Sequence, residues 1–147
     1  METMTERAAQ TSLINAPLNT CWNIVLDFEN YPNWAKDVKE AVVLGRDAEG
    51  RATQVEYRAS ALGRSTHYTL AYDYSQAPAR LSWHLVDGDI MRALDGAYSF
   101  VEVEGGTQVF YELDIELVVP LPGFVKRRAE ARILVEAVKE LKARAES

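Results

Sequence analysis

The sequence has a single cysteine, Cys21, and only two histidines, His67 and His84. One cysteine excludes an internal disulfide framework and is typical of a protein in a reducing compartment. Neither histidine lies at metal-ligand spacing from the cysteine or from a carboxylate, so we expect no zinc or iron site and no cofactor. Because Cys21 precedes Trp22 in a helical pattern, we interpret it as a small buried apolar residue rather than a nucleophile.

Long apolar runs and targeting signals are also missing. No stretch approaches the roughly 20 apolar residues that a membrane-spanning helix needs. The N-terminal sequence METMTERAAQ lacks the basic and then apolar segments of a secretory signal. We therefore expect a cytoplasmic protein with no transmembrane segment.

Positive charge is in the minority. The formal net charge is −6, from 16 lysines and arginines against 22 aspartates and glutamates. Residues 124–147 carry seven basic and four acidic side chains, a balance of +3, which leaves −9 for the rest of the chain. The charges of this C-terminal segment alternate in sign, as on a solvated helix face. An acidic chain of this kind is not expected to bind nucleic acid.

What the chain does have is the composition of an ordinary globular protein, with 48% hydrophobic and 26% charged residues in a length of 147. That length is most simply one domain, residues 1–147, and it is large enough for a sizeable core. No internal repeat, linker or low-complexity tract divides the sequence.

The C-terminal segment, residues 123–146, is the only long helical pattern. Pro120 and Pro122 precede it, and Gly123 lets the chain turn into it. Its apolar residues form one stripe, as a helix lying on a core requires. The predicted stripe contains Phe124, Ala131, Leu134, Val138, Leu141 and Ala145. Arg127 falls within it, so either the helix covers a site that is not wholly dry or the guanidinium reaches water near the helix start.

The rest of the chain predicts one strand, two short helical segments and then six strands. The first strand covers residues 7–14, and the helical segments cover residues 17–28 and 28–34. From Val38 onward apolar residues recur with a period of two, which predicts strands. These strands cover residues 38–47, 52–61, 65–74, 80–87, 91–104 and 107–119, joined by short turns such as residues 62–64 and 105–106. Because such turns are too short for parallel crossovers, we predict an α+β fold with an antiparallel sheet, one face covered by the C-terminal helix.

The inward positions of these strands are unusually aromatic. They carry Tyr57, Tyr68, Tyr72, Trp83, Tyr98 and Tyr111. A buried tyrosine hydroxyl needs a hydrogen-bond partner, and several on one face are hard to satisfy in a dry core. Apolar rings with converging hydroxyls are typical of a small-molecule pocket. The alternative is that the rings fill the concave side of the sheet, with hydroxyls bonded to one another or reaching its rim.

Catalytic motifs are sparse. His67 and His84 fall on the face opposite the aromatic one, and no glycine-rich phosphate loop is present. Three serines without a nucleophile motif or an in-phase base are Ser60, Ser65 and Ser82. Three carboxylates that alternate onto the polar face, where we expect them to contact only water, are Glu112, Asp114 and Glu116.

Three stretches in this order resemble a known superfamily. They are Asn15-Ala16-Pro17 before a tryptophan-bearing helix, DFENYPNW after it, and VPLPGFVKRR at the start of the last helix. The chain is similar over essentially its whole length to the START/Bet v 1-like helix-grip proteins (SRPBCC superfamily), in the polyketide cyclase/dehydrase-like group. The resemblance implies a curved seven-stranded antiparallel sheet wrapped around the long helix, with a hydrophobic cavity between them. Relatives cyclise aromatic polyketides, carry lipids or sterols, bind quinones or sense hormones, so the fold alone does not fix the function.

The resemblance also tests an enzymatic role. Characterised aromatase/cyclases of this fold carry a serine and an arginine on the inward face of the strand after a Gly-Arg hairpin, where this chain has Leu70 and Tyr72. A further pocket tyrosine of those enzymes corresponds to Val38. The alternative catalytic arrangement uses Arg127 as the cation, with Tyr72 or Tyr98 as the hydrogen-bond donor.

We therefore predict first a domain that binds a small hydrophobic, lipid, aromatic or polyketide-like molecule, as a monomer or homodimer. The predicted ligand-binding residues are Trp34, Tyr57, Tyr68, Leu70, Tyr72, Trp83, Leu85, Tyr98, Tyr111, Phe124, Arg127 and Leu134. Among them, Trp34 is either a lid residue or a plug for the open end of the core. The alternatives are a polyketide aromatase/cyclase or dehydrase, and a quinone-binding or partner-binding interaction protein.

Overall fold

The computed structural model describes residues 8–61, 63–119 and 121–147. Within them, seven antiparallel strands form one sheet in the order β1-β7-β6-β5-β4-β3-β2. The strands are β1 (Ala8–Ile14), β2 (Val38–Arg46), β3 (Ala52–Ala61), β4 (Arg64–Asp73), β5 (Arg80–Gly88), β6 (Met91–Val103) and β7 (Gly106–Leu117). The alternating pattern predicted the ends of β2 to β7 to within two residues. Arg7, Leu62 and Pro120, which the sequence placed in a strand, a turn and a helix start, lie outside the described residues.

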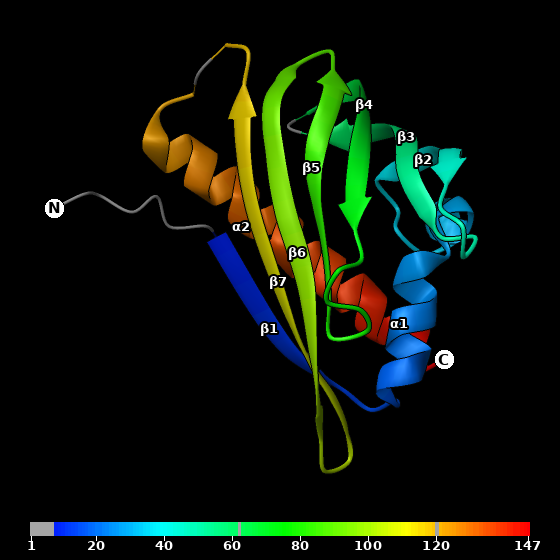
Figure 1. The fold of residues 1–147 in the computed structure, drawn as a ribbon. Helices are drawn as coiled ribbons and strands as arrows, with labels where there is room; N and C mark the ends of the chain where they lie inside the picture. Colours follow the sequence, from blue (N-terminus) through cyan, green and yellow to red (C-terminus); the bar gives the residue numbers. More distant parts are fainter. Residues whose placement is uncertain (1–7, 62, 120) are drawn as a thin grey trace, which may run out of the picture.

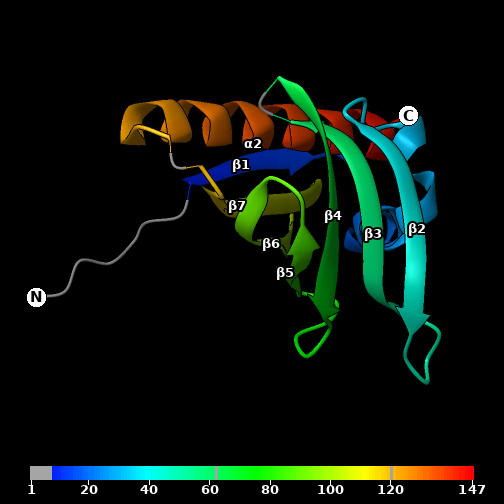
Figure 2. The same ribbon diagram turned by 90° about the horizontal axis from the view of Figure 1, so that it is seen from above.

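The sheet is strongly curved around the long helix α2 (Gly123–Ala145). Figure 1 shows α2 crossing behind β7 and β6, and Figure 2 shows β2, β3 and β4 turning away from β1 to enclose one side of the helix. Register shifts interrupt the β2–β3, β4–β5 and β6–β7 pairs, and such bulges bend and twist a sheet locally. This arrangement is the START/Bet v 1 helix-grip fold, as the sequence predicted.

Two short helices connect the ends of the sheet. Helix α1 (Leu18–Leu26) follows Pro17, whose extended backbone precedes the first helical residue. A 3-10 helix, η1 (Phe28–Asn33), follows and packs against β2. Phe28 is buried, and its ring centroid lies 4.5 Å from that of Tyr72 on β4. The two short helices thereby cover the part of the concave face that α2 does not reach.

The predicted apolar stripe of α2 is correct in its second half and wrong in its first. Leu134, Val138 and Leu141 are buried, whereas Phe124 is 63% exposed and Ala131 is also exposed. The first turns of α2 pass the end of the sheet, where the side chain that faces β7 is Glu130. Its carboxylate accepts the Ile115 backbone N–H at 2.8 Å, so a polar residue occupies the buried side of the helix there.

The prediction that the outer carboxylates of β7 contact only water is also wrong. Three ion pairs on this strand join Glu112 to Arg80 at 3.1 Å, Asp114 to Lys126 at 2.9 Å and Glu116 to Arg92 at 3.3 Å. The Arg92 cation comes from the adjacent strand β6 and the Lys126 cation from the start of α2. Arg80 lies on β5, and its long side chain crosses β6, where it also bonds to Ser99, to reach β7. Periodicity assigns a residue to a face but does not say which neighbour lies beside it.

Candidate functional site

A cavity of about 170 Å³ lies between the concave face of the sheet, η1 and α2. Its walls are mostly aromatic and aliphatic side chains from β3 to β7, with η1, the segment after it and α2 on the other sides. The aromatic residues that line it are Tyr31, Trp34, Tyr57, Tyr68, Tyr72, Trp83, Tyr98 and Tyr111. Small apolar cavities of this kind are the usual site for an organic ligand.

Antiparallel register brings the rings together. Tyr57 on β3 lies directly opposite Tyr68 on β4, with ring centroids 5.3 Å apart. In the same way Tyr98 on β6 lies opposite Tyr111 on β7, and these rings stack at 4.6 Å. Such cross-strand pairs stabilise the sheet and present a continuous aromatic wall to the cavity.

The Trp83 ring extends this wall because Gly96 lies opposite it. A Cβ atom at position 96 would lie 2.6 Å from Trp83 Cε2, which is closer than side-chain carbons approach one another. The glycine therefore lets the indole lie flat over β6. Its ring reaches Tyr98 at 5.5 Å and Tyr111 at 5.8 Å.

The tyrosine hydroxyls divide into two groups. The Tyr57 and Tyr72 hydroxyls bond to each other at 2.5 Å, and Tyr31 donates to the Val25 carbonyl at 2.5 Å. Within the described residues, the hydroxyls of Tyr68, Tyr98 and Tyr111 have no protein partner, and they line the cavity. No fully enclosed side-chain oxygen or nitrogen of the described chain lacks a hydrogen bond, so these three hydroxyls face the cavity space.

Burial keeps these hydroxyls protonated. It raises the pKa of Tyr68 to about 12 and the pKa of Tyr98 and Tyr111 well above the usual value of a tyrosine. Each side chain is therefore a neutral hydrogen-bond donor and acceptor near neutral pH. None of the three is a general base under these conditions.

The charged residues of the cavity lining are Asp37, Glu136 and Glu140, on α2 and on the segment that joins η1 to β2, and we call this part of the cavity its mouth. Lys36 of that segment makes an ion pair with Glu136 at 2.8 Å, and its backbone N–H donates to Glu140 at 3.2 Å. The neighbouring Trp34 lines the cavity, with its ring centroid 5.1 Å from that of Tyr31. Trp34 is half-buried here, and its role as a lid or as a plug stays a prediction.

Most of the predicted site residues lie together. The cavity is lined by Trp34, Tyr57, Tyr68, Leu70, Tyr72, Trp83, Tyr98 and Tyr111, all of which were predicted from strand phase or from the resemblance. Four others do not line it: Leu85, Phe124, Arg127 and Leu134. Leu134 is buried in the helix–sheet contact, Leu85 is half-buried at the edge of the core, and Phe124 and Arg127 are exposed at the start of α2.

The α2 residues at the cavity are different from those predicted. Ile133, Ala137 and Glu140 recur at steps of four and three, one residue before the stripe of Leu134, Val138 and Leu141. The stripe packs on β1 and β7, while the adjacent face is turned toward the cavity. This adjacent face mixes apolar and acidic side chains, so a prediction based on a purely apolar stripe did not include it. Tyr31, Met91, Leu94, Leu113 and Ile115 also line the cavity.

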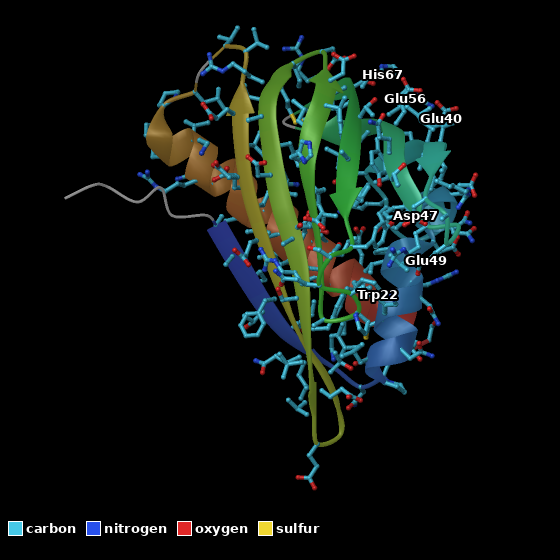
Figure 3. All side chains as sticks on the ribbon, in the orientation of Figure 1. Trp22, Glu40, Asp47, Glu49, Glu56 and His67 are labelled. Atoms are coloured by element: carbon cyan, nitrogen blue, oxygen red, sulfur yellow. The ribbon has the colours of Figure 1, made fainter. Side chains whose placement is uncertain are left out.

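The groups most often used in catalysis lie elsewhere. His67 and His84 are exposed on the outer face of the sheet, where Figure 3 shows His67 near Glu56 and Glu40 along β4, β3 and β2. Cys21 is fully buried outside the cavity lining, and burial raises the pKa of its thiol. Among the residues with described placement, no group of three or more His, Cys, Asp or Glu side chains is arranged to hold a metal ion.

Comparison with known proteins gives one matching family. A family model described as polyketide cyclase / dehydrase and lipid transport matches residues 14–142. A search of curated proteins finds no match. In the described chain, none of the helices has the length and apolarity needed to cross a bilayer.

Solved structures show the same fold. A START superfamily protein from Mycobacterium smegmatis is 27% identical, with a TM-score of 0.91 over 97% of this chain and 98% of that one. The Zhui aromatase/cyclase of a Streptomyces species is 14% identical, with a TM-score of 0.81 over 95% of this chain and 93% of that one. A STAR-related lipid transfer protein from Xanthomonas axonopodis is 15% identical, with a TM-score of 0.73 over 95% and 85% of the two chains.

Proposed function

Since this chain belongs to the polyketide cyclase / dehydrase and lipid transport family, we propose that it binds a small aromatic molecule in the cavity between sheet and α2. The observation that carries this proposal is the group of three tyrosine hydroxyls, of Tyr68, Tyr98 and Tyr111, that face an apolar cavity without a protein partner. A ligand oxygen in the cavity would supply the missing hydrogen bonds. The aromatic walls would bury its ring.

The size of the cavity limits the ligand. An engineered cavity of about 150 Å³ in another protein binds benzene, so the cavity of about 170 Å³ accommodates a single aromatic ring with a short substituent. A fused-ring polyketide or a diacyl lipid is much larger. Such a ligand would need the Trp34 segment and α2 to move apart.

Binding is favoured over cyclisation by the groups that line the cavity. Forming and stabilising an enolate needs a base and a cationic or donor group near the carbonyl. The cavity tyrosines keep their protons. The resemblance aligns Leu70 and Tyr72, which line the cavity, with the serine and arginine of characterised aromatase/cyclases. Arg127, the alternative cation, is exposed at the start of α2. The tyrosines are therefore suited to hold an oxygen as neutral donors. Asp37, Glu136 and Glu140 could serve as bases, but no lysine, arginine or histidine among the described residues lines the cavity to stabilise an enolate.

Native mass spectrometry of the gently purified protein, repeated after denaturation, tests the proposal. We expect a small-molecule adduct that disappears on denaturation, or stoichiometric uptake of a single-ring phenol such as para-ethylphenol. Ala137→Phe fills the cavity from α2 and should abolish uptake. Ala143→Phe makes the same change at an exposed position of α2 and should not.

Two results would contradict the proposal. One is a clean ligand-free mass with no uptake of any aromatic probe. The other is equal uptake by the Ala137→Phe and Ala143→Phe variants, because the ligand would then lie outside the cavity.

A further inference from the structure

The charged groups of the cavity are all acidic. Asp37, Glu136 and Glu140 line its mouth, and among the described residues no lysine, arginine or histidine lines it. The nearest cation on this segment is Lys36, and its ammonium group is bound to Glu136. An anionic ligand would meet uncompensated negative charge at this position.

Glu140 lines the cavity without a cationic partner among the described residues and, unlike the exposed Asp37, it is partly buried. It accepts the Lys36 backbone N–H, but within the described chain it makes no ion pair. Burial is the largest influence on this carboxyl and raises its pKa; the Lys36 N–H and the Lys36 charge oppose the rise, and the negative charges of Asp37 and Glu136 add to it. A cation placed beside Glu140 would therefore be stabilised by a carboxylate that has lost part of its hydration.

The cavity lining also supplies neutral hydrogen-bonding groups. Tyr98 and Tyr111 are 6% and 9% exposed, and their hydroxyls face the cavity without a protein partner. Burial raises the pKa of Tyr98, and the negative charge of Glu140 raises it further. The two side chains therefore interact electrostatically, and both line the cavity. The cavity thus combines a neutral polar wall, an aromatic wall and an acidic mouth.

We propose that the ligand of this cavity is a single-ring arylalkylamine, with its ammonium group at Glu140 and a ring oxygen at the Tyr98 and Tyr111 hydroxyls. The ring lies among the aromatic side chains, and the alkyl chain spans the distance to the mouth. This inference rests on the proposed function and adds the charge of the ligand to it. Arg127, a predicted ligand-binding residue, has no role in this arrangement, because it does not line the cavity.

Three probes that share one ring and differ in the charge of the side chain test the inference: tyramine, para-ethylphenol and para-hydroxyphenylacetate. We expect tyramine to bind about tenfold more tightly than para-ethylphenol at low salt, because a hydrogen-bonded ion pair at a half-buried carboxylate replaces a neutral contact. The acid should bind most weakly. Isothermal titration calorimetry at one pH gives the three dissociation constants.

Matched variants connect the preference to one carboxylate. Glu140→Gln should remove the preference for tyramine over para-ethylphenol, because the amide carries no charge but keeps an acceptor for the Lys36 N–H. Glu116→Gln removes the same charge on the outer strand face, beside Arg92, and should keep the preference.

The outcomes separate the two proposals. If none of the three probes binds, the proposed function fails. If para-ethylphenol or the acid binds wild-type protein as tightly as tyramine, the arylalkylamine inference is overturned while binding of an aromatic ligand stands. The same conclusion follows if the preference survives in Glu140→Gln. The wild-type ranking needs no variant, so a poorly folded variant does not prevent the test.

Discussion

Gly96 is the residue on which the position of the Trp83 indole depends. An alanine Cβ there would lie 2.6 Å from Trp83 Cε2 and Cζ2, so Gly96→Ala must displace the ring or bend β6. We expect a loss of about 1–3 kcal/mol in the free energy of unfolding, the usual cost of overpacking a core. Urea denaturation followed by tryptophan fluorescence measures it.

The double variant Gly96→Ala, Trp83→Phe provides the control for this contact. If the clash with the indole is the cause, the two substitutions together should cost less than the sum of their separate effects. Strict additivity would mean that the glycine is needed for its backbone rather than for the space it leaves.

Glu130 joins α2 to the sheet through a buried hydrogen bond. It is 4% exposed, accepts the Ile115 N–H at 2.8 Å and lies 3.3 Å from the Lys126 ammonium group. Glu130→Ala leaves the strand N–H buried without a partner, so we expect it to destabilise the protein by about 1–3 kcal/mol. Glu130→Gln keeps an acceptor and should cost less.

Hydrogen exchange at the Ile115 amide distinguishes this cause from a general loss of stability. Its exchange should accelerate in Glu130→Ala more than exchange at buried amides in the centre of β5 and β6. Equal acceleration at all of these amides would show that Glu130 contributes through helix packing alone.

The elements differ in how far the sequence predicts them. Alternation gave β2 to β7, and strand phase gave the inward rings, because both depend on local periodicity. The buried face of α2 was predicted correctly only in its second half. In the first half Glu130 is buried because it bonds to Ile115 on β7, and the periodicity of the helix alone does not show this contact. Which tyrosine hydroxyls pair and which face the cavity depends on cross-strand register and ring orientation, and the outward position of Arg127 depends on where the sheet ends. None of these is encoded in a single stretch.

At the scale of the whole molecule, polar contacts join α2 to the rest of the protein at three places along the helix. Lys126 bonds to Asp114 near the helix start, and Lys36 bonds to Glu136 beside the cavity. At the other end Lys142 donates to the Leu13 carbonyl at 2.8 Å. Together with the packing of Leu134, Val138 and Leu141, these contacts keep the helix in place although one of its faces borders a cavity. A site that is not filled by protein side chains is therefore compatible with a stable fold.

The Glu140 carboxylate should lower the stability of the ligand-free protein, and the pH dependence of the free energy of unfolding tests this. Because burial raises the pKa of Glu140, the folded state disfavours its charged form relative to the unfolded state. Glu140→Gln should therefore raise the free energy of unfolding at neutral pH. The gain should shrink as the pH falls through the raised folded pKa and disappear below the unfolded value of about 4.3.

Glu136→Gln should do the opposite, because hydrogen bonding to Lys36 lowers the pKa of Glu136. This variant should lose stability at neutral pH, and the loss should fade in acid. Urea titrations of both variants and wild-type protein across this range measure the differences. A Glu140→Gln gain that does not change with pH would mean that the carboxylate is fully hydrated, and it would remove the physical reason for a cation at the mouth.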